Sequence, residues 1–269
     1  MSGHFLKNIL FTLFLLLPTT VYAADNAAIT KTLEALTDGE LTAGKPVTGT
    51  IIIRDIASGD AVTLDSLISR NKRRIHLWLV DPTFTDIQHL HPETSITPYT
   101  FNFTFIPKIT SSYMAWADIT THATNKQELL VGWLGEKDAA FIERIESHTK
   151  AMNGHNFTLS FDVPPQVGQT SIVNLNVTDH QKKPVKWSIE AMAKQYSPVE
   201  YFSLIGFYDD NTHAIAAMQE TDTYFYGPTY GPDVKFKITP TQAGYVKMFA
   251  HVTISGKEMF VPFGVMIQK

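Results

Sequence analysis

Apolar and polar residues alternate with a period of two along much of the chain, which predicts β-strands. In the clearest stretch, 99–105, four aromatic residues alternate with threonine and asparagine. This alternation is typical of a strand with one buried face. The run 75–80 is apolar on both faces, which predicts a central strand covered from two sides. Residues 136–152 have apolar spacing typical of a helix, and we interpret this stretch as a connector.

Two blocks of the sequence recur at constant offsets. A glycine opens and an aspartate closes each of two strand-like runs, 44–55 and 168–179, which are offset by 124 residues (168 − 44 = 124). A second pair of blocks, 103–119 and 236–252, recurs at an offset of 133 residues (236 − 103 = 133). Matching blocks with the same internal spacing predict a duplicated domain.

These patterns predict an all-β fold: two tandem immunoglobulin-like β-sandwich domains joined by a short helical connector, after a cleaved signal peptide. Strand-like segments recur about every ten residues, with turn-forming residues between them, as in such sandwiches. The expected boundaries are 1–23 for the signal peptide, 24–135 for the first domain, 136–154 for the connector and 155–269 for the second domain.

The N-terminal segment has the features of a secretory signal. Lys7 supplies a positive charge, an apolar run follows at 9–17, and Val21 and Ala23 fit the small-residue rule for signal peptidase. The apolar run is shorter than the roughly 20 residues that a membrane-spanning helix needs. The sequence therefore predicts a periplasmic or secreted protein with no membrane span in the mature chain. It contains no cysteine, so it has no disulfide.

Charge and motif content narrow the function classes. Removal of the signal with its one lysine leaves 21 basic residues (22 − 1 = 21) against 26 acidic ones. This mild negative balance argues against nucleic acid or an anionic membrane surface as a partner. The sequence has no nucleophile elbow, metalloprotease helix, phosphate-binding glycine loop or cysteine nucleophile, so we predict that the protein is not an enzyme.

A strand histidine followed by a His-x-His-Pro sequence is the most distinctive motif of the first half. The run 75–80, the sequence His-Leu-His-Pro-Glu at 89–93 and the strand-like stretch 113–119 together resemble the YtkA-like group of extracytoplasmic β-sandwich domains. In the second half, 156–161 and 256–263 resemble the same group. The resemblance implies the sandwich fold and, because this group is often associated with copper handling, a metal-related role. The second half departs from the pattern, because the histidine set is not repeated there.

His76, His89 and His91 form the first candidate metal site. His89 and His91 are two positions apart, so in an extended chain their side chains share one face, about 6.6 Å apart. Three neutral imidazoles suit copper, zinc or nickel. Glu93 or Asp86 is expected to complete or support the ligand shell. The alternative is a structural polar cluster in which the ring nitrogens only satisfy hydrogen bonds.

Two weaker candidates lie in the second half. His213, Met218 and His251 form a set that suits Cu(I), although methionines in strands usually fill the core. An aromatic loop rich in glycine and proline is a possible binding loop, with a loop folded over the end of the sandwich as the alternative. Its tyrosines are Tyr224, Tyr226 and Tyr230.

Two functional hypotheses from different classes follow. The first is an exported, non-enzymatic protein that binds a metal ion, copper or else zinc, or passes it on as a chaperone does. The second is a protein–protein interaction module of the cell envelope, or a secreted host-interacting protein, that needs no metal. Fold class alone does not choose between them.

Overall fold

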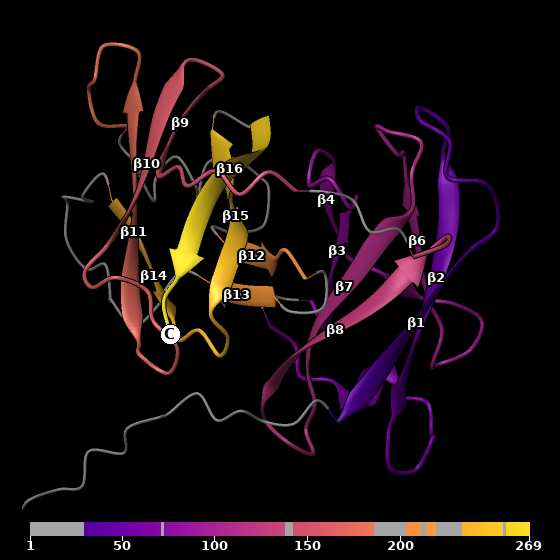
Figure 1. Cartoon of the computed structure of the whole chain (residues 1–269). Helices are drawn as coiled ribbons and strands as arrows, with labels where there is room; N and C mark the ends of the chain where they lie inside the picture. The colour runs from indigo at the N-terminus through magenta and orange to yellow at the C-terminus, as the bar shows by residue number, and fades with distance from the viewer. Residues whose placement is uncertain are drawn as a thin grey trace, which may run out of the picture.

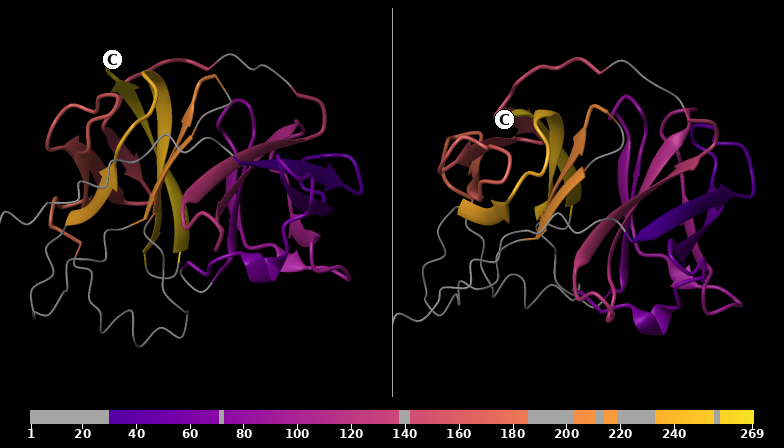
Figure 2. Two further views of the ribbon diagram at one scale, coloured as in Figure 1. Left: turned by 90° about the horizontal axis from the view of Figure 1, so that it is seen from below. Right: turned by 60° about the horizontal axis from the view of Figure 1, so that its bottom comes forward.

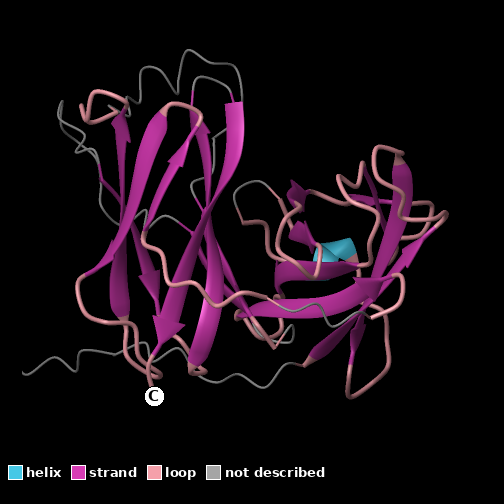
Figure 3. Cartoon of the chain, turned by 45° about the horizontal axis from the view of Figure 1, so that its top comes forward, coloured by secondary structure: helices cyan, strands magenta, loops and turns pink. Residues whose placement is uncertain are grey.

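The computed structural model describes residues 30–70, 73–137, 142–185, 203–210, 214–218, 233–254 and 257–269. In these ranges the regular structure is β-strand, apart from one three-residue 3-10 helix at Leu64–Ser66 (Figure 3). The prediction of an all-β chain is therefore confirmed. Within the described part of the chain, no helix is long and apolar enough to cross a membrane.

The first half of the chain forms two four-stranded antiparallel sheets (Figure 1). Their strands are β1 (Lys31–Thr37), β2 (Val47–Asp55), β3 (Ile75–Val80), β4 (Ile87–Leu90), β5 (Glu93–Thr94), β6 (Phe101–Phe105), β7 (Tyr113–Thr120) and β8 (Gln127–Leu134). The N-outer sheet has the order β1-β2-β6-β5, and the N-inner sheet has the order β4-β3-β7-β8.

The second half also forms two four-stranded sheets. Their strands are β9 (Thr149–Met152), β10 (His155–Phe161), β11 (Ser171–Asp179), β12 (Ser203–Tyr208), β13 (Ala214–Met218), β14 (Asp233–Ile238), β15 (Gly244–Ile254) and β16 (Lys257–Ile267). The C-inner sheet has the order β13-β12-β15-β16, and the C-outer sheet has the order β14-β11-β10-β9.

Each half encloses its own apolar core between its two sheets, because alternate side chains of each strand point inward. The core of the first half includes Ile51, Leu77, Phe101, Phe103 and Tyr113. The core of the second half includes Phe157, Leu175, Phe236, Val246 and Phe263.

A third apolar cluster joins the halves, because the free faces of the N-inner and C-inner sheets pack against each other. Trp78 and Trp116 of the N-inner sheet are buried there with Phe207 and Phe249 of the C-inner sheet. The ring centroids of Trp116 and Phe207 are 5.6 Å apart. The four sheets are therefore stacked as layers (Figure 2). Every residue of β3 is buried, as the two-sided apolar run 75–80 predicts.

The two halves repeat one pattern of strands and turns. Both inner sheets have the same strand order, and β10-β11-β14 repeats β1-β2-β6. Gly44 N–H donates to the Pro107 carbonyl at 2.8 Å, and Gly168 N–H donates to the Pro240 carbonyl at 2.8 Å. Both glycines have positive φ, 76° and 74°, which glycine adopts without a Cβ clash. These shared details support the duplication that the sequence predicts.

The prediction of a helical connector at 136–154 is wrong. Residues 142–154, which the structure describes, contain no helix. Ser147 exchanges backbone hydrogen bonds with Gly264 of β16, at 2.9 and 3.0 Å, and Thr149–Met152 is strand β9. Backbone groups that pair with a neighbouring strand are not available for the bonds of a helix. Residues 138–141 of the predicted connector lie outside the described residues.

Candidate metal centre

Strands β3 and β4 place two histidines on one face of the N-inner sheet, and a third follows directly after β4. Trp78 of β3 and His89 of β4 are register partners. Because side chains alternate, His76 shares the face of Trp78, which is turned toward the C-inner sheet. His91 lies two residues after His89 and reaches the same group.

The ring nitrogens of these histidines converge. Nδ1 of His76 lies 3.2 Å from Nε2 of His89 and 3.3 Å from Nε2 of His91. One nitrogen from each ring lies within 4.8 Å of the other two. Nitrogen ligands about 2.0–2.1 Å from a tetrahedral ion are about 3.3–3.4 Å apart. The structure thus brings together His76, His89 and His91, and the two separations at His76 match those of ligands that share an ion.

The orientation of His76 is fixed by the backbone. Its Nε2–H donates to the carbonyl oxygen of Arg70 at 3.2 Å. Since a carbonyl only accepts, the neutral ring carries its lone pair on Nδ1, the atom that faces His89 and His91. A hydrogen bond from the outer ring nitrogen to a carbonyl is also how proteins orient imidazole ligands of metals.

Burial keeps the three imidazoles neutral. It lowers the pKa of His76 and His89 below the ordinary histidine value. Burial, reinforced by the positive charge that a protonated His76 would carry, lowers the pKa of His91 to about 4. A neutral imidazole is the form that coordinates a metal. Trp78 stacks on His89 with ring centroids 4.0 Å apart, which holds that ring in place.

A buried carboxyl group beside this site was missed by sequence reasoning. Asp118 of β7 is the register partner of His76 and is 5% exposed. Its carboxylate accepts a hydrogen bond from Gln127 Nε2 at 2.8 Å. Burial raises the pKa of Asp118 to about 6. The signal for it was present, because Asp118 is the one acidic residue in the strand Tyr113–Thr120.

The two acidic residues that the sequence proposed lie elsewhere. Glu93 is exposed on β5 of the N-outer sheet and is not part of the compact histidine group. Asp86 is buried, and its carboxylate accepts hydrogen bonds from the Tyr113 hydroxyl at 2.7 Å and the Lys108 amide at 2.8 Å. Neither carboxylate therefore joins the cluster as the structure stands.

The weaker candidates are only partly described. His213 and the loop tyrosines Tyr224, Tyr226 and Tyr230 lie outside the described residues. Met218 pairs in register with Ser203, which pairs on its other side with His251. The ring of His251 lies 5.2 Å from that of His89, so this histidine adjoins the first site. A separate second site stays a prediction.

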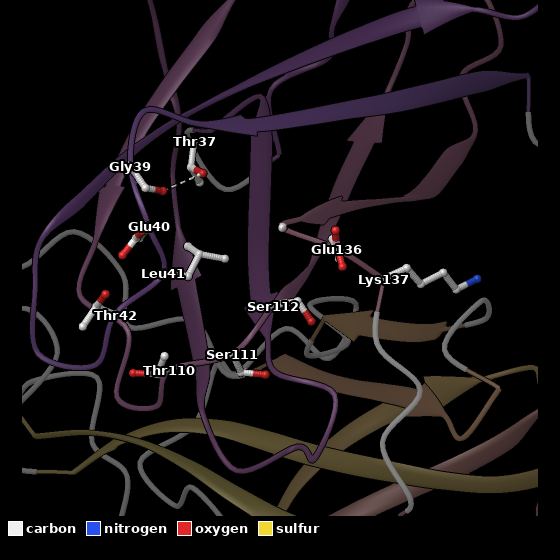
Figure 4. Close-up of a pocket in the computed structure, with 11 residues that line it drawn as sticks. Thr37, Gly39, Glu40, Leu41, Thr42, Thr110, Ser111, Ser112, Glu136 and Lys137 are labelled. Carbon is white, nitrogen blue, oxygen red and sulfur yellow. Dashed lines mark hydrogen bonds between the residues drawn. The ribbon is translucent and has the colours of Figure 1, made fainter.

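A pocket of about 610 Å³ opens in the first half (Figure 4). Ser112, which lines it, directly precedes β7, whereas Asp118 beside His76 lies near the other end of that strand. The lining combines hydroxyl groups with the side chains of Glu40, Glu136 and Lys137. The pocket is therefore separate from the histidine site.

Comparison with known proteins gives no family. No family model and no curated protein matches the chain. A DUF4785 family protein from Legionella pneumophila is similar over 88% of this chain and 56% of its own length, with 12% identity and a TM-score of 0.26. This chain thus spans about half the length of that protein.

Two further solved structures have similarly low scores. S. aureus TarS is similar over 87% of this chain and 39% of its own, with 7% identity and a TM-score of 0.23. Domains 4 and 5 of the S-layer protein SbsC are similar over 88% of this chain and 98% of their own, with 10% identity and a TM-score of 0.22. At these scores the likeness carries no argument about function.

Proposed function

We propose that this chain is an exported, non-enzymatic protein that binds a transition-metal ion, copper in the first place and zinc in the second, through His76, His89 and His91. The observation that carries the proposal is the 3.2 and 3.3 Å approach of two Nε2 atoms to Nδ1 of His76. One lone pair accepts one N–H, so only one of the two Nε2 atoms is able to hydrogen-bond well to Nδ1 of His76, whereas a cation could be shared by all three nitrogens.

The ligand chemistry favours copper or zinc over calcium or magnesium. Imidazole nitrogen suits the late transition metals, whereas the harder ions prefer oxygen. Three imidazoles leave at least one coordination position open on a tetrahedral ion. That position can be taken by a fourth ligand of this chain or, when the ion is passed on, by a ligand of a partner protein, as a metal chaperone requires. The signal-like segment 1–23 supports export.

We infer further that each half is an immunoglobulin-like sandwich. The orders β1-β2-β6-β5 and β4-β3-β7-β8 correspond to the orders A-B-E-D and C′-C-F-G of that fold. Tyr113 begins the strand that corresponds to F. Its hydroxyl, which donates its proton to Asp86 at 2.7 Å, also lies 3.3 Å from the carbonyl oxygen of Ile109, four residues upstream. This contact is typical of the tyrosine corner of such domains. The resemblance to the YtkA-like group rests on the sequence and points the same way.

Titration of the purified protein with Cu(II) and with Zn(II) tests the metal proposal. We expect a dissociation constant below about 10 μM for at least one ion. The double variant H89A/H91A should lose this binding. The matched control is His180→Ala, because His180 is exposed in the turn after β11. Weaker binding of both ions, or binding that survives H89A/H91A, would leave the histidines as a structural polar cluster.

A further inference from the structure

A fourth histidine reaches the cluster from the other half of the molecule. His251 lies on β15 of the C-inner sheet and is 6% exposed. Its ring centroid is 5.2 Å from that of His89 and 5.9 Å from that of Trp78, both of which belong to the N-inner sheet. The histidine cluster therefore borders the junction between the two inner sheets.

The two ring nitrogens of His251 have contrasting surroundings. Nε2–H donates to the Glu258 carboxylate at 2.7 Å. Nδ1 is buried, and it has no hydrogen-bond partner among the residues that the structure describes. A buried polar atom without a partner is uncommon in folded proteins and calls for an explanation, and a bound ion is one such explanation.

The contact with Glu258 fixes which nitrogen is able to coordinate. Because the carboxylate accepts a hydrogen bond from Nε2–H, the neutral ring has its lone pair on Nδ1. A carboxylate on the outer nitrogen is the usual partner of a metal-bound histidine, since it orients the ring and increases the basicity of the ligand. Phe260 stacks on His251 at 4.6 Å, so the ring is also held from the side.

We propose that His251 is the fourth ligand of the metal ion, so that the bound ion bridges the two halves of the molecule, with Glu258 as the positioning residue. This inference rests on the proposed metal binding by His76, His89 and His91. His251 is not part of the compact group whose nitrogens lie within 4.8 Å of one another. Binding would therefore draw its ring toward the other three, and four imidazoles would surround the ion.

Counting the nitrogens on bound Cu(II) tests the bridge directly. The full chain loaded with one equivalent of Cu(II) is compared with His251→Ala and His251→Gln by electron paramagnetic resonance and its pulsed variants. We expect four coordinated imidazoles in the natural sequence and three in both variants. Glutamine keeps a donor for Glu258 and much of the side-chain volume, so it separates loss of a ligand from loss of packing. His180→Ala serves as the control and should keep four.

Affinity provides a second measure that applies to Zn(II) as well. We expect both His251 variants to bind the ion at least tenfold more weakly. Glu258→Gln should bind about 10- to 100-fold more weakly, as outer partners of metal ligands commonly do, while four nitrogens remain on Cu(II).

The outcomes separate this inference from the proposed function. One outcome is that the ion needs His89 and His91 while both His251 variants keep the natural nitrogen count and affinity. That result would overturn the role of His251 and leave the proposed function standing. Absence of binding by the natural sequence would overturn both. Loss of one nitrogen together with weaker binding supports both.

Discussion

Three histidines, one buried and two half-buried, give the metal-free protein a definite pH dependence. The pKa of His76, His89 and His91 is lower in the folded chain than the ordinary value of 6.5, and for His91 it is about 4. Between these values the unfolded chain binds more protons than the folded chain. The free energy of unfolding should therefore be fully retained above pH 6.5 and fall as the pH drops toward 4. Urea unfolding at stepped pH values measures this decline.

Substitution identifies the source of that pH dependence. His91→Asn removes one of the titrating groups, so the decline below pH 6.5 should become shallower. His180→Asn alters an exposed histidine and should leave the decline as it is. An identical decline in the natural sequence and in His91→Asn would contradict the assignment.

The sequence identifies some residues of the candidate site and misses others for physical reasons. Two-residue spacing is enough to place His89 and His91 on one face, because side chains alternate along a strand. Glu93 follows them closely, yet the chain leaves the N-inner sheet after Leu90 and enters the N-outer sheet at Glu93. His251 is far away in sequence, and its place beside His89 depends on how two separate sheets pack.

Among the elements, the close packing of β16 against the segment 145–147 depends on Gly264. A Cβ on Gly264 would lie 1.9 Å from the carbonyl oxygen of Ile145 and 2.6 Å from the Tyr245 hydroxyl. Gly264→Ala should therefore force the 145–147 segment away from β16. We expect a loss of about 1–3 kcal/mol in the free energy of unfolding. Urea denaturation gives this value.

Gly39→Ala is the matched control for that substitution. A Cβ on Gly39 has no heavy atom within 4 Å, and its φ is not in the left-handed region. We expect its free energy of unfolding to stay within about 0.5 kcal/mol of that of the natural sequence. Equal effects of the two substitutions would argue against close packing at Gly264.

The alternating pattern predicts a strand correctly where burial of one face determines the structure. The helical pattern predicts a helix wrongly where backbone pairing with a distant strand determines it. Phe101–Phe105 alternates between buried and exposed residues, as its sequence predicts. The segment after residue 141 has few apolar residues to bury, and Ile145 is 55% exposed. Its backbone is instead held by β16 through Ser147, a contact between residues that are distant in sequence.

For the molecule as a whole, the cluster between the inner sheets should make the halves behave as one unit. Phe207 is fully buried there, with ring centroids 5.6 Å from Trp116 and 5.9 Å from Phe84. Phe207→Ala should lower the free energy of unfolding by about 3–5 kcal/mol. Denaturation followed by tryptophan fluorescence and by far-ultraviolet circular dichroism measures the loss.

An exposed apolar side chain supplies the comparison. Ile106 is 52% exposed, so Ile106→Ala should change stability by less than about 1 kcal/mol. A similarly small effect of Phe207→Ala would show that the inner sheets do not depend on each other.

The sequence indicates the duplication but not how the copies meet. The apolar run 75–80 shows that β3 is covered on both sides, and it leaves open which surface covers it. One face is covered by the N-outer sheet, and the other is covered by the corresponding sheet of the second copy. This arrangement depends on side-chain complementarity between Trp116, Phe207 and their neighbours, which no local pattern encodes.

Joining two related copies in one polypeptide removes a constraint that symmetric dimers obey. In a two-fold dimer each surface meets an identical surface, so every ligand set occurs twice. Here Ser203 and Ala216 occupy the register positions that correspond to His76 and His89. The facing surfaces are free to diverge, and covalent linkage keeps them together on dilution. Metal analysis should accordingly find one tightly bound ion per chain. The free-ion concentration at half-saturation should not depend on protein concentration.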